Sequence, residues 1–567
     1  MANNLVILFC FESFFALLFT YFLYFYFIKK NLNIVVSIIC FITWYSVFVL
    51  TIILLYDISN KEDKDVHNII EIAYNIIYYI IFFDAWIIIP LLQQYESAGD
   101  FTIKGRIKRS IISNLIYYIC YIIVCVICSI FIMFNYKKFY KNTDNVETKN
   151  KFQTIIDTSI NLANMYGLIL VVLLLSYSLV KFPKFLHRYY NNSIRIKYLE
   201  WKFAKIENNL EDTKEALITY MYIIQTTLFK IKLLSKELCD LENEIKIIYD
   251  DIIENYNIYE ININKQLFDN EPVESVNKLI EIHSTIKTLK STIVILKYQK
   301  TKIFEEWLKI KSALALSNEF NDDSDLTLTL NHKKLNDFEP INLKKKEIFY
   351  ILKIRPILII ILEIILITFC ILIFISEITL FLKKYTSFSL FGSLINLFRN
   401  NLFILHFAIF LPIFFMFFLC FFTLFNMKIS GYYGMYGNRH TDGNSILFIS
   451  SLMCKICFSL CLNVVEMVAY NNDNPPILLQ KFMNIQETKY LNYDIYKYFS
   501  LFCPLLMVVL VSLNYYNVFA KLMNAAGVNS FDVDSEERDE QINDGKDDLK
   551  KMLKNYNKGL IKDKNLY

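Results

Sequence analysis

Long apolar runs are the feature of this sequence that most restricts its fold. Nine stretches carry almost no charge, and a helix of about twenty apolar residues crosses a hydrocarbon core of roughly 30 Å. Because backbone groups in a bilayer must bond within their own segment, such runs predict transmembrane helices. We therefore expect an all-α fold, a polytopic transmembrane helical bundle of nine spans: Leu5–Ile28, Ile34–Tyr56, Ile69–Leu92, Ser110–Phe134, Ser159–Val180, Pro356–Leu382, Leu402–Asn426, Ser445–Tyr470 and Tyr498–Phe519.

Charged residues divide the chain into domains. They make up 20% of the 567 residues and concentrate between 184 and 355 and after 521. This distribution predicts four parts: spans one to five in 1–183, a soluble insertion in 184–350, spans six to nine in 351–523 and a cytoplasmic tail in 524–567. The net charge of +4, with no stripe of basic and aromatic residues, gives no reason to expect a nucleic-acid partner.

Basic residues set the expected orientation in the bilayer. None precedes the first run, and Lys29 and Lys30 follow it, so we expect a retained helix with its N-terminus outside or in a lumen. An odd number of spans then puts the insertion and the tail in the cytoplasm, and the inner loops carry more Lys and Arg than the outer ones. One inner loop holds four candidate contacts for anionic lipid headgroups, with a purely orienting role as the alternative: Lys104, Arg106, Lys108 and Arg109.

The insertion has the pattern of long amphipathic helices. Apolar residues recur at spacings of three, four and seven from Leu199 to Ile248, and again from Val276 to Leu314, a period that predicts helices with one buried face. Joined by the polar residues 255–275, two such helices predict an antiparallel coiled-coil hairpin, with a compact helical bundle as the alternative. Residues 317–340 are expected to be a flexible return to the membrane, and the tail to be largely disordered with one short helix near 544–554.

Signatures of catalysis are missing from the sequence. It has no phosphate-binding glycine loop, HExxH motif or nucleophile elbow, so we expect neither enzyme activity nor a cofactor. Eleven of the twelve cysteines lie in or beside apolar runs, which argues against a disulfide framework. Cys454, Cys457 and Cys461 share a helix face, but a metal site needs a further ligand and polar surroundings, so we expect them to be packing residues.

Four segments spread along the chain stand out: WIIIPLLQQYESAGDFTIKGRIKRSIISNLIYY (86–118), NMYGLILVVLLLSYSLVKFPK (164–184), HTDGNSILFISSLMCKICFSLCLN (440–463), and NAAGVNSF with INDGKDDLKK in the tail. Together they resemble the limb-region (LMBR-like) membrane protein family, closest to its second domain-containing type. The resemblance implies nine spans, an outside N-terminus and a cytoplasmic coiled-coil insertion after the fifth span. It also implies a receptor- or adaptor-like role without a catalytic mechanism.

Ionisable residues inside the spans are candidates for a functional site, because a charge at the bilayer centre costs roughly 2.5–3.5 kcal/mol on insertion scales. Lys455 lies deep in the eighth run, where the resemblance also implies a basic residue, and Glu363 or Glu377 is its expected partner. Such a site binds a substrate, an ion or a lipid headgroup, or else locks helices together through a structural ion pair. The candidate intramembrane charge site comprises Lys455, Glu363, Glu377, Glu466 and Asp84.

Two functions of different classes follow from these features. The leading hypothesis is a receptor- or scaffold-like regulator of signalling or trafficking, which binds cytosolic or membrane proteins through its coiled-coil insertion. The alternative is a transporter, or a carrier of a lipid or small ligand, that uses the buried charges. In either case we expect a multi-pass protein of the plasma membrane or an endomembrane, surrounded by the lipid bilayer. The sequence indicates neither its ligand nor its oligomeric state.

Overall fold

The computed structural model of the protein describes residues 2–30, 32–59, 64–139, 151–256, 272–321, 344–382, 393, 397–398, 402–426, 434–468, 479, 491–525, 531–532 and 535–557. Within these ranges the regular structure is helical and no β-strand is formed, which confirms the predicted all-α fold. The chain divides into two compact units. The membrane unit comprises Met1–Glu96, Ile107–Phe182 and Ile367–Tyr516, and the insertion unit comprises Ser97–Arg106, Pro183–Leu366 and Asn517–Tyr567.

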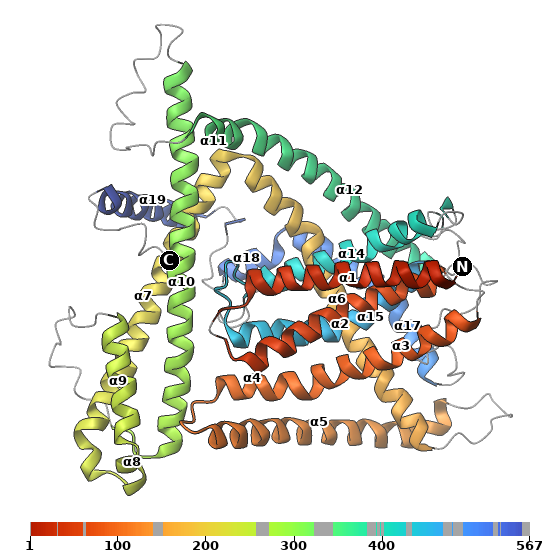
Figure 1. The fold of residues 1–567 in the computed structure, drawn as a ribbon, viewed down its shortest axis with the longest axis horizontal. Helices are drawn as coiled ribbons and strands as arrows, with labels where there is room; N and C mark the ends of the chain where they lie inside the picture. Colours follow the sequence, from red (N-terminus) through yellow and green to blue (C-terminus); the bar gives the residue numbers. More distant parts are fainter. Residues whose placement is uncertain are drawn as a thin grey trace. The chain divides into compact units, whose positions relative to one another are not determined.

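The membrane unit is a bundle of long apolar helices. It contains α1 (Ala2–Phe27), α2 (Ile34–Ser59), α3 (Lys64–Phe83), the π-helical turn η1 (Asp84–Ile88), α4 (Ile89–Ser97), α14 (Leu402–Asn426), α15 (Gly443–Val468) and α17 (Leu491–Tyr515), and most of α5 (Ile103–Phe139), α6 (Lys151–Tyr190) and α12 (Arg355–Leu382). α2 packs against α1, α3, α14 and α15, and these helices lie side by side in Figure 1. These contacts bury Val36, Leu50 and Leu54 of α2 completely, while Val35 and Ile38 on its open side are more than half exposed.

Seven helices of the described chain are long and apolar enough to cross a membrane: Ile7–Phe27, Ile34–Ser59, Asn68–Ser97, Met165–Tyr190, Lys345–Thr379, Phe403–Asn426 and Gly443–Val465. They coincide with seven of the predicted runs. The other two runs fall on α5 and α17, whose side chains are described in part. The multi-pass architecture is thus confirmed, and the count of nine stays a prediction.

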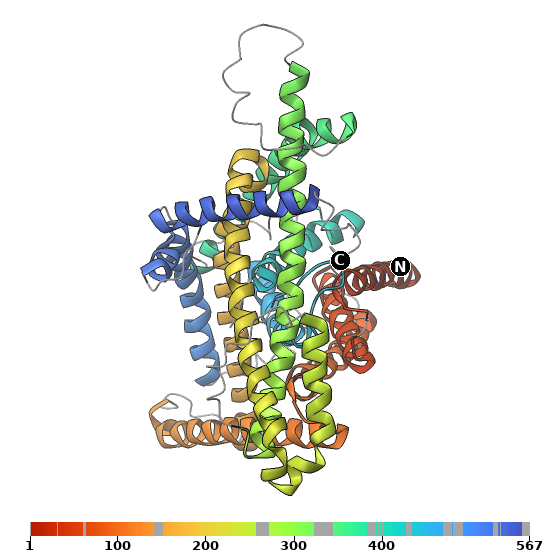
Figure 2. The ribbon, with the colours of Figure 1, turned by 90° about the vertical axis from the view of Figure 1, so that its left-hand side faces the viewer.

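The insertion unit is built on two long helices, α7 (Asn192–Lys230) and α10 (Val276–Asn321), which pack along each other. α7 begins where it does because the Asn191 side chain accepts hydrogen bonds from the N–H groups of Ser193 and Ile194. The long helices were predicted, whereas their coiled-coil character remains a prediction. Figure 2 shows α7 and α10 as the long yellow and green helices. The other elements of the insertion unit are η2 (Ile231–Leu233), α8 (Lys236–Asp240), α9 (Glu242–Tyr256), α11 (Lys345–Phe349), η6 (Tyr350–Ile354), α18 (Val518–Ala525) and α19 (Glu536–Asn557).

The expectation that the first helix continues to Ile248 was wrong. α7 ends at Lys230, the chain turns through η2 and α8, and α9 folds back against α7. The apolar period persists through this turn because Leu238, Ile245 and Ile252 enter the same buried cluster as Leu217 and Ile286. This end of the insertion is therefore a bundle of three helices. The polar stretch 255–275 and the return 317–340 lie largely outside the described residues.

The tail contains a longer helix than expected. α19 has 22 residues and includes the whole of the predicted 544–554. It packs across α7 (Figure 2), and Leu549 and Leu553 enter a buried cluster with Phe203 and Trp307. Four apolar residues at helical spacing, including Met552 and Tyr556, make this one-sided contact in an otherwise charged segment.

Candidate functional site

Lys455 lies within the membrane unit, as predicted, on α15. Its ammonium group sits 5.4 Å from the centre of the Trp86 ring, within range of a cation–π interaction. Gly167 of α6 approaches closely here, because a Cβ at that position would overlap the side chain of Ser459 and lie 2.7 Å from the carbonyl oxygen of Lys455. Among the described residues no carboxylate forms a salt bridge with Lys455.

Asp84 and Glu377 are buried carboxyl groups with separate partners. Asp84 lies in η1 and accepts a hydrogen bond of 2.9 Å from the Thr43 hydroxyl of α2. Glu377 of α12 accepts a hydrogen bond of 2.6 Å from the amide of Asn463 on α15. Each bond joins two helices, and polar pairs of this kind contribute to helix association in membranes. The two carboxyl groups therefore serve the packing of the bundle in this conformation.

The remaining acidic candidates lie apart from these. Glu363 belongs to the insertion unit, where its carboxylate is 3.4 Å from Nδ1 of His187. Glu466 is in α15, and its side chain falls outside the described residues. The described residues of the predicted charge site therefore each contact a separate partner and do not form one cluster.

The four basic residues near the start of α5 differ in how far their side chains are exposed. Lys104 and Lys108 are exposed, whereas Arg106 and Arg109 are partly buried. The guanidinium of Arg106 donates a hydrogen bond of 2.8 Å to the Asp100 carbonyl. Lys104 and Lys108 therefore keep the exposure that a lipid contact needs, while Arg106 also holds its own loop.

A polar cluster joins α1, α2 and α14 at one end of the membrane unit. Glu12 Oε1 lies 3.1 Å from His406 Nδ1, and His406 Nε2 lies 3.0 Å from the Ser59 hydroxyl. The Tyr56 ring meets the imidazole edge to face at 4.7 Å. Glu12 Oε2 and the Tyr56 hydroxyl are buried near each other, but neither has an aligned hydrogen bond among the described residues.

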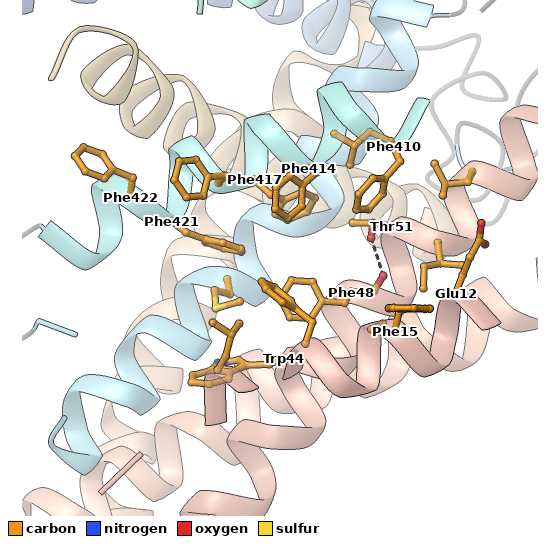
Figure 3. A pocket seen from close by; sticks show the side chains of 18 of the residues that line it. Glu12, Phe15, Trp44, Phe48, Thr51, Phe410, Phe414, Phe417, Phe421 and Phe422 are labelled. Carbon is orange, nitrogen blue, oxygen red and sulfur yellow. Dashed lines mark hydrogen bonds between the residues drawn. The ribbon is translucent and has the colours of Figure 1, made fainter. Parts of the chain in front are cut away.

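An apolar cleft begins at this cluster. Its volume is about 850 Å³, and fourteen of its 26 lining residues are phenylalanine. Two contacts between α1 and α14 bound it, the Glu12–His406 pair at one end and the Phe27–Phe425 rings, 5.4 Å apart, at the other. Figure 3 shows the row of α14 rings facing Phe15 and Phe48, with Glu12 at the end of the cleft.

A charge network fixes the base of the insertion unit. Arg195 at the start of α7 donates two hydrogen bonds to Glu306 of α10, at 2.9 and 2.6 Å, and Arg355 at the start of α12 donates a third at 3.2 Å. Burial opposes ionisation of Glu306, but the two guanidinium groups outweigh it and hold the pKa of Glu306 below its usual value. The network thus ties together the three helices at the point where the insertion leaves the spans.

Comparison with known proteins decides the family. The profile of the LMBR1-like membrane proteins matches residues 5–519. The chain belongs to the LMBR1-like membrane protein family. The match covers all the predicted spans and the insertion between them, and it confirms the resemblance seen in the sequence segments.

Individual relatives of this LMBR1-like protein are distant. Over 485 residues it is 25% identical to LMBR1 domain-containing protein 2 homolog A of Dictyostelium discoideum. This match covers 84% of this chain and 62% of the relative, which is less than two thirds of the relative's length. It is 23% identical over 511 residues to the human G-protein coupled receptor-associated protein LMBRD2, which covers 85% of this chain and 69% of the relative. The Caenorhabditis briggsae protein of that name is 24% identical over 479 residues, 81% of this chain and 69% of the relative. No solved structure matches.

The sequence of this LMBR1-like chain did not single out three polar residues that the structure shows to be paired: His406, Arg195 and Arg355. In the sequence, His406 is one of six scattered histidines, and Arg195 and Arg355 are two of the many basic residues near the ends of the insertion. Their partners lie far away in the sequence, with Glu12 and His406 separated by 394 positions. One signal was available: His406 is an ionisable residue inside an apolar run, where a polar partner is expected.

Proposed function

We propose that this chain is a non-catalytic membrane protein that associates with other membrane proteins and regulates their signalling or trafficking. G-protein coupled receptors are the partner class tested first, because relatives carry the name G-protein coupled receptor-associated protein. The insertion carries the binding surface and faces the cytoplasm. The observation that supports this most is a packed helical unit attached through α6 and α12 to apolar spans at both ends.

A specific surface for this role lies at the turn of the insertion. Phe229 and Leu233 flank the end of α7 and are 77% and 86% exposed. Two large apolar side chains left so exposed only four positions apart are suited to contact with another protein. Ile231 and Leu238 are the members of the buried cluster at this turn, whereas Phe229 and Leu233 belong to neither buried cluster, so these two residues can be changed without opening the core of the unit.

Changing both residues to serine is expected to weaken receptor binding by about tenfold or more, since each side chain loses apolar burial in the complex. The measurement is affinity capture after mild cross-linking of co-expressed, tagged G-protein coupled receptors by the full-length protein and by the F229S/L233S variant. Lys232→Ser at the same exposed turn is the matched control and is expected to bind normally. If F229S/L233S and a version lacking 200–340 both capture the same receptors as the wild type, the proposal is wrong.

A carrier function is the second candidate, and Lys455 favours it. An ammonium group in a membrane helix whose described contact is an aromatic ring is able to attract an anionic substrate. Lys455→Met keeps the length of the side chain and removes the charge. The carrier hypothesis predicts lost charge movement in proteoliposomes on addition of small carboxylates, with normal expression and thermal stability. Unchanged charge movement in this variant, after a clear signal from the wild type, excludes the hypothesis.

A further inference from the structure

The cleft between α1 and α14 has the shape of a lipid site. Phe15, Phe407 and Phe414 line it and are 54%, 58% and 40% exposed, so one side of the cleft is open along the surfaces of two spans. In a bilayer that opening faces lipid. The volume of about 850 Å³ falls in the range of sites that enclose one small molecule, roughly 300–1,000 Å³.

The polar end of the cleft lies near the membrane surface. At 1.5 Å of rise per residue, Glu12 is about 8 Å from the start of the span Ile7–Phe27 and His406 about 5 Å from the start of Phe403–Asn426. Ser59 ends the span Ile34–Ser59. A molecule with its polar group at Glu12 and its apolar body along the phenylalanines would therefore have the orientation of an amphiphile in one leaflet.

The lining residues restrict the headgroup. No Lys or Arg occurs among the described residues of the cleft, and the carboxyl group of Glu12 disfavours a phosphate. Ser59 donates its hydroxyl proton to the Leu55 carbonyl at 2.7 Å, so His406 Nε2 donates to Ser59 and the Glu12–His406 pair shares one proton. Such a pair is neutral overall. Glu12 Oε2, which is buried beside the Tyr56 hydroxyl and makes no regular hydrogen bond among the described residues, has a lone pair for one further donor, such as a hydroxyl group.

We propose that this cleft binds a neutral membrane lipid with a single hydroxyl group, of which a sterol is the type, with the hydroxyl at Glu12 and the apolar body between α1 and α14. A rigid ring system suits a cleft lined by flat aromatic faces, because it loses little conformational freedom on binding. A phospholipid would need a polar surface for its headgroup that the lining does not provide.

The test is photolabelling of the full-length protein in phosphatidylcholine nanodiscs. The probes are a photoactivatable cholesterol, the same compound without its hydroxyl group, and a photoactivatable phosphatidylcholine. We expect cholesterol to label peptides of α1 and α14, unlabelled cholesterol to compete, and the probe without the hydroxyl to label about tenfold less, as for the loss of one hydrogen bond. Equal labelling by all three probes would overturn the proposal.

Two variants separate the apolar cleft from the recognition of the hydroxyl. Ala16→Phe fills the cleft and is expected to abolish labelling, whereas Leu18→Phe, which adds the same ring on α1 outside the lining, leaves it unchanged. Glu12→Leu is expected to label equally with and without the hydroxyl. The proposal is also wrong if A16F labels like the wild type, if E12L still discriminates, or if cross-links join two protein copies through α1 and α14 in place of lipid. The competition by unlabelled cholesterol needs no variant, so it remains decisive should a variant misfold.

Discussion

Replacing Gly545 by alanine is expected to release α19 from α7, although the same change in a free helix is stabilising by about 1 kcal/mol. A Cβ at Gly545 would overlap the carbonyl oxygen of Glu200 and lie 2.8 Å from its carbonyl carbon. These are backbone atoms inside α7 and cannot move aside as a side chain does. The helix must lift, and Leu549 and Leu553, each worth about 1.5–3 kcal/mol when fully buried, lose their contacts.

Hydrogen exchange of residues 536–557 in the full-length protein measures this release. We expect amide protection of α19 to fall by about a hundredfold, as for the loss of about 3 kcal/mol of docking free energy. Lys551→Ala is the matched control, because it also introduces alanine into α19 but at an exposed position, and it is expected to leave protection nearly unchanged. Increased protection in G545A would show that α19 behaves as a free helix.

The parts of this fold that were predictable are those whose cause is local. A run of about twenty apolar residues has one stable solution in a bilayer, a helix, so the spans follow from the residues themselves. The same holds for α7 and α10, because the spacing of Leu199, Phe203 and Ile206 on one face requires a buried side.

The turn at the end of α7 and the docking of α19 were not predictable in this way. Leu238 and Ile245 keep a helical period across the turn, since α9 packs into the cluster that a continued α7 would also have faced. α19 has few apolar residues in a highly charged stretch. Its position depends on Gly545 meeting the backbone at Glu200, which is a fit between distant segments.

The polar groups of the candidate sites show the same limit. The intramembrane charges were recognised as individuals, but their partners lie on other helices: Trp86 for Lys455, Thr43 for Asp84 and Asn463 for Glu377. A pairing of opposite charges was the simplest expectation for these residues. The described contacts are instead an aromatic ring, a hydroxyl and an amide, which need no second charge inside the bilayer.

Glu306→Gln is expected to destabilise the insertion unit by about 2 kcal/mol. Removing one partner from a buried charge network costs 3–5 kcal/mol, and we discount this because the Glu306 side chain is 26% exposed. Arg195, which is nearly fully buried, keeps its charge and loses its carboxylate. For a unit of this size the melting temperature should fall by about 5 °C at pH 7.

The effect of Glu306→Gln should disappear in acid. Because the pKa of Glu306 is lowered in the fold, its contribution is fully present above its usual value of 4.5 and is lost as the pH falls through the lowered value. Below that point the wild-type carboxyl is protonated and resembles glutamine, so the two melting temperatures should converge. Glu305→Gln removes the same charge from the neighbouring position of α10, where no ion pair is formed among the described residues, and should melt like the wild type at every pH. If E305Q and E306Q melt alike at pH 7, or if the deficit of E306Q persists in acid, the network does not hold the base of the insertion.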